Sequence, residues 1–248
     1  MKSLRPPLTV TDIAIPLAFP LLMWFVYWFE ISFHFNFNDF GVKPGEFYGL
    51  RGILFGPFIH SGVEHLFNNT IPIFMLSLAL MYFYRPIAFQ VFFLGYLSTG
   101  ILTWLIARPS YHIGASGVVY MLFAFLFFKG LLSKHFRLIA VSMIVIFIYG
   151  SLVWGVFPGE PGISWEGHLS GLMTGTALAV FYRKKGVIFT YPKEEQNKDE
   201  EDEFTRQFDE DGNFKPVDPE ESENSNDALS HTADQVAVKI DYEVKKTN

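Results

Sequence analysis

Polar side chains interrupt the long apolar runs of this sequence, and they are its best candidates for chemistry. His65 and Asn69 are four positions apart, so they share one face of a helix. Two hydrogen-bond donors on one face can bind a developing oxyanion, while capping and interhelical hydrogen bonds are the structural alternative. Because polar groups at membrane depth are costly and usually serve a function, the pair is a candidate oxyanion site.

The residues just before this pair indicate where its helix begins. Ser61 is followed three residues later by Glu64, a capping-box pattern that predicts Ser61 as the N-cap. His60 then precedes the N-cap and His65 lies in the first turn, at two positions whose side chains commonly touch. We therefore expect His60 to lie beside His65.

Ser116 is the candidate hydroxyl group of the sequence. It stands between Ala115 and Gly117 and begins an apolar run of 13 residues that ends before Lys129. Such a helix is about 20 Å long, against about 30 Å of membrane hydrocarbon. Ser116 is therefore expected below the outer membrane surface, with the loop 109–115 dipping into the protein. An ordinary N-cap serine is the structural alternative, but its N–H also suits an anion.

A third polar site lies in a glycine-rich run near the end of the apolar region. Gly167, Gly171 and Gly175 form two overlapping G-x-x-x-G steps, which predict a helix packed closely on a neighbour. His168 shares a stripe with Gly171 and Gly175, so its imidazole is expected in that interface, within reach of a partner side chain. A structural histidine is the alternative. Glu166 is expected to point elsewhere, which leaves no carboxylate at membrane depth nearby.

These candidates depend on membrane helices for their positions, because each lies in or beside an apolar run. Six stretches are apolar enough to be considered as spans: 13–33, 61–84, 87–107, 116–128, 138–157 and 165–182. Their short connections place nine basic residues on one side and three on the other, which predicts both termini in the cytoplasm. We expect an all-α, polytopic six-helix bundle, integral to a plasma or inner membrane. His34 and His112 then face solvent in external loops and receive no role.

Charge divides the chain of 248 residues into an apolar body and an acidic tail. Residues 1–186 hold 12 Lys and Arg against 7 Asp and Glu, whereas residues 187–248 hold 7 against 18. We expect a cytoplasmic N-terminus over 1–12, a membrane domain over 13–186 and a mostly disordered cytoplasmic tail over 187–248. The chain has no Cys, which excludes disulfide scaffolds, thiolate–zinc sites and cysteine catalysis. Without a basic patch, nucleic-acid binding is not expected.

The motifs, taken in chain order, resemble those of the rhomboid family of intramembrane serine proteases. They read His60-x-x-x-x-His65-x-x-x-Asn69, then Gly114-Ala-Ser116-Gly117-x-x-Tyr120, then Gly167-His168-x-x-Gly171-x-x-x-Gly175. The resemblance covers the six-span region, about residues 13–183, and nothing in the tail. It implies a six-helix rhomboid-like bundle with both termini in the cytoplasm.

The resemblance also implies a role for each motif residue. Ser116 is the expected nucleophile and His168 its general base, in a two-residue dyad without metal or cofactor. His65, Asn69 and the Ser116 amide are expected to form the oxyanion hole. The residues expected to support these groups are His60, Gly114, Gly117, Tyr120, Gly171 and Gly175. Among them, Tyr120 is expected to pack on the His168 ring and orient it.

One position departs from the family pattern, which usually has Trp-Arg where this chain has Arg51-Gly52. The external loop is therefore expected to be anchored differently. The expected substrates are transmembrane helices, cut near the outer membrane boundary within the lipid bilayer. Two alternatives stay open: a metal site built from His60, His65 and His168, and a rhomboid-like protein that binds membrane helices without cutting them. The sequence does not determine the oligomeric state.

Overall fold

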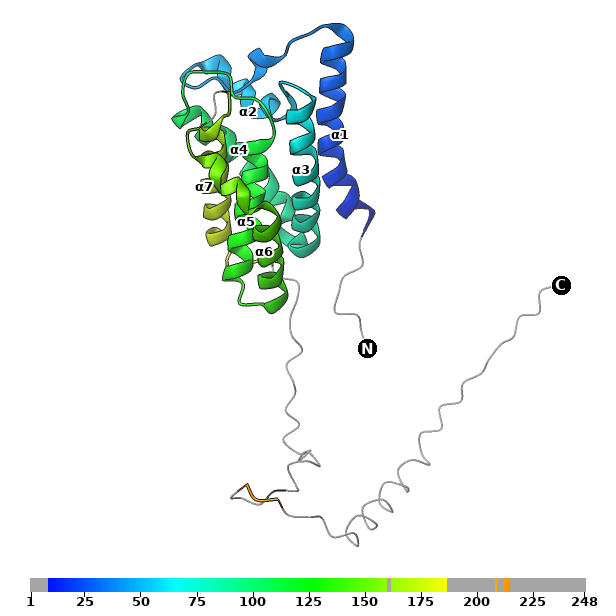
Figure 1. Cartoon of the computed structure of the whole chain (residues 1–248), viewed down its shortest axis with the longest axis vertical. Helices are drawn as coiled ribbons and strands as arrows, with labels where there is room; N and C mark the ends of the chain where they lie inside the picture. The colour runs from blue at the N-terminus through cyan, green and yellow to red at the C-terminus, as the bar shows by residue number, and fades with distance from the viewer. Residues whose placement is uncertain (1–8, 160–161, 187–207, 209–211, 215–248) are drawn as a thin grey trace, which may run out of the picture. The chain divides into compact units, whose positions relative to one another are not determined.

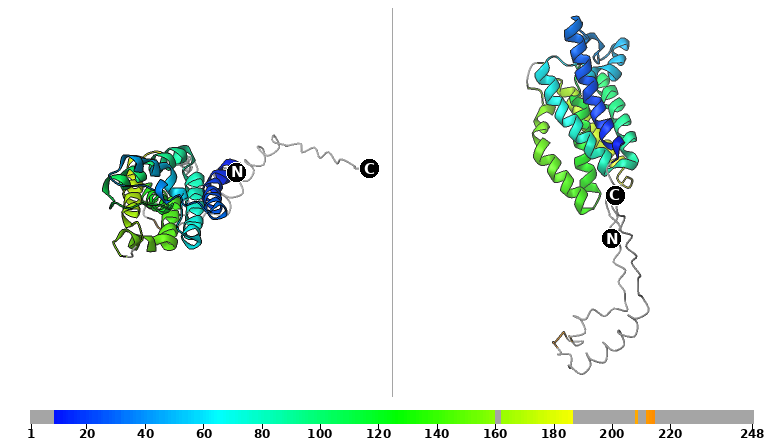
Figure 2. Two further views of the ribbon diagram at one scale, coloured as in Figure 1. Left: turned by 90° about the horizontal axis from the view of Figure 1, so that it is seen from above. Right: turned by 90° about the vertical axis from the view of Figure 1, so that its right-hand side faces the viewer.

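The computed structural model describes residues 9–159, 162–186, 208 and 212–214, and within these it contains helices and no strand. The long helices are α1 (Val10–Phe33), α3 (Val63–Phe83), α4 (Arg85–Ile106), α5 (Ser116–Leu132), α6 (Phe136–Tyr149) and α7 (Trp165–Phe181). The short elements are η1 (Asn38–Phe40), η2 (Phe47–Arg51), α2 (Gly52–Phe55), η3 (Gly56–Phe58) and η4 (Gly150–Val156). The long helices run side by side, with α1 at one edge against α3 (Figures 1 and 2).

Four helical segments of the described residues are long and apolar enough to cross a membrane. They are α1, α3, α4 and the continuous run of α6 and η4 over Phe136–Val156. Helices α5 and α7 have 17 residues each, at the lower limit of the length of a membrane span. The all-helical class of the fold is thus confirmed, while the crossing of the membrane by all six helices stays a prediction.

Helix α5 is the centre of the bundle, because it packs on α3, α4, α6 and α7. Every residue from Val118 to Leu126 is buried, as expected for a helix that is apolar on all sides. Its closest partner is α7, and glycine makes the approach possible. A Cβ on Gly171 would collide with the Gly117 carbonyl, and one on Gly175 with the Met121 carbonyl. The close packing predicted from the glycine spacing is therefore present.

The far end of α5 corrects one expectation. The helix continues to Leu132 rather than ending before Lys129, so the expected length of 13 residues was wrong. Lys129 is fully buried, and its Nζ donates to the carbonyl oxygens of Tyr182 at 2.8 Å and Arg183 at 3.0 Å. Its charge is satisfied by the end of α7, so it does not mark the end of the apolar helix.

The start of α1 and the end of α7 lie at the same end of the bundle (Figure 1). Asp12 of α1 forms an ion pair with Arg85 at the start of α4. Tyr84 precedes Arg85, and its ring centroid lies 5.9 Å from Lys129 Nζ. Lys129 in turn donates to carbonyl oxygens at the end of α7. We call this the Lys129 end, and the other the Ser116 end. Which side of a membrane each faces stays a prediction.

The chain separates into two units, Met1–Tyr191 and Pro192–Asn248. In the second unit the structure describes Phe208 and residues 212–214, where Phe208 and Phe214 form an isolated bridge with ring centroids 5.8 Å apart. The expected acidic tail of 187–248 otherwise lies outside the described residues, as do residues 1–8.

Candidate active site

Ser116 and His168 meet where the first turns of α5 and α7 pack together. Ser116 is the first residue of α5, with Ala115 rather than Ser116 at the N-cap position. The distance from Ser116 Oγ to His168 Nε2 is 2.8 Å, that of a good hydrogen bond. His168 is buried, whereas Ser116 is half-buried. The two side chains come from segments 52 residues apart in the chain.

The second ring nitrogen of His168 determines which way the proton lies. His168 Nδ1 is 2.9 Å from the carbonyl oxygen of Gly155 in η4. A carbonyl can only accept, so Nδ1 carries the hydrogen and the neutral ring turns the lone pair of Nε2 toward Ser116. A backbone carbonyl thus orients the imidazole, as a carboxylate does in a three-residue triad.

The sequence did not point to Gly155, because a backbone carbonyl leaves no mark on residue type. Its missing side chain is the one available signal: a Cβ there would collide with the Tyr120 hydroxyl and lie 3.2 Å from His168 Nδ1. Tyr120 stacks on the His168 ring, with centroids 4.2 Å apart and planes inclined by 6°. The hydrogen bond and the stacked ring together hold the plane of the imidazole.

Gly114 brings the loop before Ser116 against His65. Its φ of +98° lies in the left-handed region that side chains disfavour. A Cβ at this position would also lie 2.7 Å from His65 Nε2. The Gly114 N–H donates to the Gly56 carbonyl at 2.9 Å. Glycine is therefore required here both by the backbone conformation and by the space that the His65 ring occupies.

His60 touches the same loop one residue further on. The Ala115 N–H donates to His60 Nε2 at 3.5 Å, and His60 Nδ1 lies 3.3 Å from the Phe58 carbonyl. Burial, helped by the neighbouring His65, lowers the pKa of His60 to about 4. The ring is then neutral at pH 7, and its Nε2 is free to accept. The His60 and His65 rings lie 4.9 Å apart, as expected from their positions.

Asn69 and Ser61 show how the His65 side of the site is held. Asn69 is buried, and its Nδ2 donates to the His65 carbonyl one turn earlier at 2.9 Å. The N-cap of α3 is Gly62. Ser61 is therefore not the N-cap, and the predicted capping box was wrong. Its hydroxyl instead lies 3.2 Å from His65 Nδ1, a partner that competes with the helix N–H groups.

A small cavity adjoins Ser116 on the side of α4. It has a volume of about 50 Å³ and is lined by polar groups of Ser116, Thr99, Thr103 and Ser164 among others. The buried Thr99 hydroxyl has no hydrogen-bond partner in the part of the chain that the structure describes. A water molecule needs about 10–15 Å³ of such volume and two or more polar partners. The cavity can therefore hold water beside the Ser116 hydroxyl.

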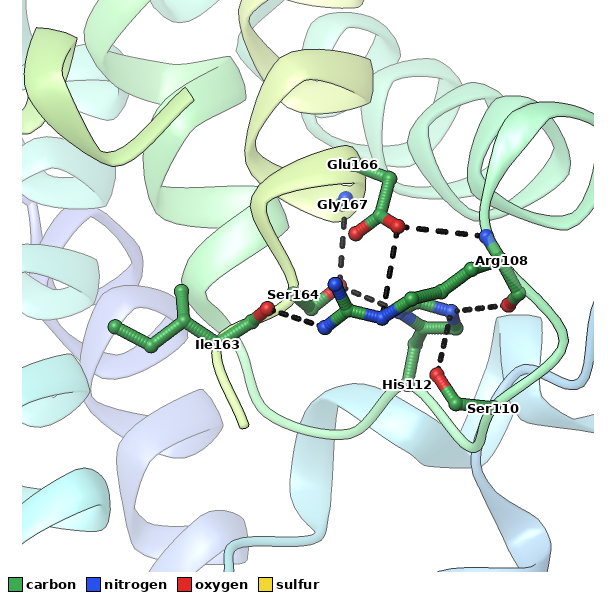
Figure 3. Close-up of polar contacts among 7 residues, drawn as sticks. All are labelled: Arg108, Ser110, His112, Ile163, Ser164, Glu166 and Gly167. Carbon is green, nitrogen blue, oxygen red and sulfur yellow. Dashed lines mark hydrogen bonds and ion pairs between the residues drawn. The ribbon is translucent and has the colours of Figure 1, made fainter. Parts of the chain in front are cut away.

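Two residues that the sequence analysis set aside lie in a polar cluster beside the site (Figure 3). His112 is buried, with 6% of its surface exposed, so the expectation that it faces solvent was wrong. Glu166 is also buried, and its Oε1 lies 3.6 Å from Arg108 Nε. His34 is exposed at the end of α1.

The external loop is anchored through Arg51. Arg51 places its guanidinium over the Phe40 ring at 4.3 Å and donates from Nη2 to the Asp39 carbonyl at 2.9 Å. Among the described residues, no group of three or more His, Asp or Glu side chains could hold a metal ion. His60 and His65 lie together, whereas His168 is engaged with Ser116.

The fold is a helical bundle with helices apolar enough to cross a membrane, and its site pairs a half-buried serine with a buried histidine. The model of the Rhomboid domain family matches residues 45–185, more than half of the chain. The chain therefore belongs to the rhomboid family. Together with the apolar helices, this membership identifies an integral membrane protein.

Similar proteins are found in mycobacteria and in a virus. An uncharacterized protein of Mycobacterium tuberculosis is 36% identical over 152 residues, which is 56% of this chain and 62% of that protein. An uncharacterized protein of Mycobacterium leprae is 32% identical over 176 residues, 66% of this chain and 68% of that protein. A protein of Acanthamoeba polyphaga mimivirus with rhomboid in its name is 28% identical over 130 residues, 50% of this chain and 71% of that protein. The matched region thus spans about six tenths of the first relative's length.

Proposed function

We propose that this chain is an intramembrane serine endopeptidase in which Ser116 is the nucleophile and His168 the general base. The observation that carries the proposal is the 2.8 Å contact between Ser116 Oγ and His168 Nε2, with His168 Nδ1 bound to a carbonyl that sets the tautomer. A serine hydroxyl is a weak nucleophile until a base within hydrogen-bond distance removes its proton. Membership of the rhomboid family supports the same activity.

The contacts of the dyad define the steps. As Ser116 Oγ bonds to the carbonyl carbon of a substrate peptide, its proton moves to His168 Nε2. The imidazolium then returns this proton to the leaving amine as the C–N bond breaks, and an acyl-enzyme remains. Water attacks the acyl carbon with His168 again as base, which releases a carboxylic acid and restores the serine. The cavity that Ser116 lines is a candidate place for that water.

The tetrahedral oxygen of this reaction needs hydrogen-bond donors. The candidates are the backbone N–H of Ser116, at the start of α5, and the side chains of His65 and Asn69. The His65 ring packs against Gly114, two residues before the nucleophile, and Asn69 is tied to His65 through its carbonyl. Removal of one oxyanion donor typically lowers the rate by about 10²–10³-fold.

The expected substrates are transmembrane helices of other proteins. The dyad lies between apolar helices, so a substrate must reach it through the bilayer and expose its scissile peptide by local unwinding. Small or helix-breaking residues near the cut are therefore expected. With the Lys129 end in the cytoplasm, as the charge distribution predicts, the Ser116 end and the cut lie toward the outer face of a plasma or inner membrane.

A fluorophosphonate probe tests the proposal directly. The purified full chain should be labelled at Ser116, while Ser116→Ala and His168→Ala should reduce labelling and substrate cleavage by about 10⁴-fold or more. Ser98 on α4 is exposed, so Ser98→Ala is a matched control that should react like the unmodified chain. Absence of labelling in the unmodified, folded protein would contradict the proposal and favour a rhomboid-like protein that binds helices without cutting them.

A further inference from the structure

A polar cluster joins the loop before Ser116 to the start of α7, away from the dyad itself (Figure 3). We call it the loop cluster, and its residues are Arg108, Ser110, His112, Ile163, Ser164, Glu166 and Gly167. Its members come from two segments only, the connection after α4 and the turn that begins α7. None of its side chains has a predicted role from the sequence.

The contact at the centre of the loop cluster is between His112 and Ser164. His112 Nδ1 lies 2.6 Å from Ser164 Oγ, and His112 Nε2 lies 3.0 Å from the Arg108 carbonyl. Because a carbonyl only accepts, Nε2 carries the hydrogen and Nδ1 accepts from the Ser164 hydroxyl. Ser164 Oγ in turn accepts the Gly167 N–H at 3.3 Å, as the N-cap of α7. The Ser110 hydroxyl oxygen lies 3.2 Å from His112 Nε2 and is a second possible acceptor for the Nε2 hydrogen.

The charges around His112 are compatible with this neutral ring. Burial lowers the pKa of His112 below its usual value, and the positive charges of Arg108 and Lys43 add to the effect. The hydrogen bond to the Arg108 carbonyl and, after it, the Glu166 carboxylate act in the opposite direction and raise the pKa of His112, but burial is the largest influence. Near neutral pH the ring therefore lacks the second proton that would block its acceptance from Ser164.

The His112–Ser164 pair lies close to the dyad along both segments. His112 lies four residues before Ser116, and Ser164 lies four residues before His168. The His112–Ser164 hydrogen bond therefore links the same two segments as the dyad, four residues before the reacting residue in each segment. His112 is also bound through its backbone to Val42, by N–H···O bonds of 2.9 Å in both directions. His112 thus joins the loop before Ser116 both to Ser164 and to Val42.

Arg108 and Glu166 flank the pair and connect the same segments. The Arg108 backbone N–H donates to Glu166 Oε1 at 3.4 Å, and Arg108 Nη2 donates to the Ile163 carbonyl at 2.7 Å. The Arg108 side chain is 44% exposed. Its charge is therefore screened by solvent and contributes little by itself. The His112–Ser164 hydrogen bond, in which the imidazole is buried and the serine half-buried, is the stronger candidate for holding the geometry.

We propose that His112 and Ser164 are positioning residues, whose hydrogen bond holds the Ser116 loop and the start of α7 at the separation that the Ser116–His168 contact requires. The proposal rests on the proposed peptidase function and adds residues that do not touch the substrate. Loss of the bond lets the two segments shift slightly, and small shifts of reacting groups lower the reaction rate strongly.

The test is a double-mutant cycle on the purified full chain with the fluorophosphonate probe. Ser164→Ala and His112→Phe should each lower the maximal labelling rate constant about tenfold, with little change in the probe concentration for half-maximal rate. The double variant should be no slower than either single one, because both remove the same bond. Ser164→Thr keeps a hydroxyl group and should restore the rate to within about twofold of the unmodified chain.

The outcomes separate the two proposals. An unmodified chain that is folded and unlabelled contradicts the peptidase function and this inference with it. A labelled chain in which Ser164→Ala reacts at the normal rate contradicts the inference alone. It is also overturned if the two single effects multiply in the double variant, or if Ser164→Thr is as slow as Ser164→Ala at equal thermal stability. Melting temperatures of all variants, measured in detergent, identify any that fail to fold.

Discussion

The two ends of the contact between α5 and α7 are built from different kinds of polar interaction. At the Lys129 end, an ammonium group donates to the backbone carbonyls of Tyr182 and Arg183. At the Ser116 end, a hydroxyl group faces an imidazole at 2.8 Å. The Lys129 ammonium group serves as an anchor, because backbone carbonyl oxygens accept hydrogen bonds but do not take up its proton. A hydroxyl beside a neutral imidazole can lose its proton, because the ring nitrogen can take it.

The His168 ring is held by groups on the sides that do not face the serine. Backbone carbonyls are used at both ends, but at the Ser116 end the Gly155 carbonyl binds the nitrogen of His168 that does not face the serine. Tyr120 then holds the plane of the ring. The reactive nitrogen is left available while the rest of the ring is fixed. Four substitutions test this contrast between an anchoring end and a reactive end.

Gly171→Ala should have the largest effect, since it separates the helices near the reactive end. Its Cβ would collide with the Gly117 carbonyl, which is backbone and cannot turn aside. We expect a loss of stability of about 1–3 kcal/mol and a fall in labelling rate of about 10²-fold or more from displacement of the dyad. Gly150→Ala, whose Cβ would meet only the flexible Ile146 side chain at 3.3 Å, is the control. Normal labelling in Gly171→Ala would show that this contact does not position the dyad.

Gly114→Ala should damage activity more than stability. An alanine at φ +98° is strained and its Cβ would displace the His65 ring. We expect the labelling rate to fall about 10²-fold, as when an oxyanion donor is lost, and stability to fall by about 1–2 kcal/mol. Gly62→Ala is a matched control, because no atom lies within 4 Å of a Cβ there and its φ of 179° suits any residue. A Gly114→Ala protein as reactive as the control would remove His65 from the proposed oxyanion site.

Lys129→Met should show the reverse pattern. It removes the donor of two carbonyl oxygens at the end of α7 while roughly keeping the side-chain volume. We expect the melting temperature in detergent to fall, in line with about 1.5–3 kcal/mol for a hydrogen bond from a charged group. The Arg183 carbonyl loses its Lys129 donor, whereas the Tyr182 carbonyl keeps the Lys185 N–H at 2.8 Å. The labelling rate of the folded fraction should change by less than about twofold, because hydrogen bonds at this end do not reach the dyad. A large loss of rate at unchanged stability would contradict the division between the two ends.

Acid should lower the stability of the fold through protonation of His60. This is the smallest of the four expected effects near neutral pH. The pKa of His60 is about 4 in the folded chain, below the ordinary histidine value of 6.5. Between these values the unfolded chain binds more protons, so stability falls as pH drops from about 6.5 toward 4 and is fully retained above this range. Melting temperatures at pH 7.5 and pH 5 should therefore differ less in His60→Gln than in the unmodified chain. Equal pH dependence in both would show that His60 is not held neutral.

Much of the site could be predicted from the sequence because spacing along a helix is a local property. The distance of four residues between His65 and Asn69 places them on one helix face without any knowledge of the fold. The glycine spacing around His168 likewise predicted a close-packed helix, and the structure has one. The predicted contact of His60 with His65 also follows from neighbouring positions in one segment, and it is present.

The errors arose where a side chain had a choice of partners. Ser61 could cap its own helix or bind His65, and only the folded loop decided for His65. Lys129 was expected to end a helix, but the end of α7 supplies carbonyl acceptors for it inside the protein. His112 was expected in solvent, yet the turn at Ser164 covers it and provides a hydroxyl partner.

Residue type and helical spacing were enough to predict the all-helical class, the apolar helices and the family motifs, because these features are local to the chain. The tertiary structure decided which carbonyl orients His168, which segments His112 joins and where the charge of Lys129 is held. Each of those contacts joins segments distant along the chain, often through a backbone atom. Backbone atoms are the same for every residue type, so their partners are defined only when the helices have packed.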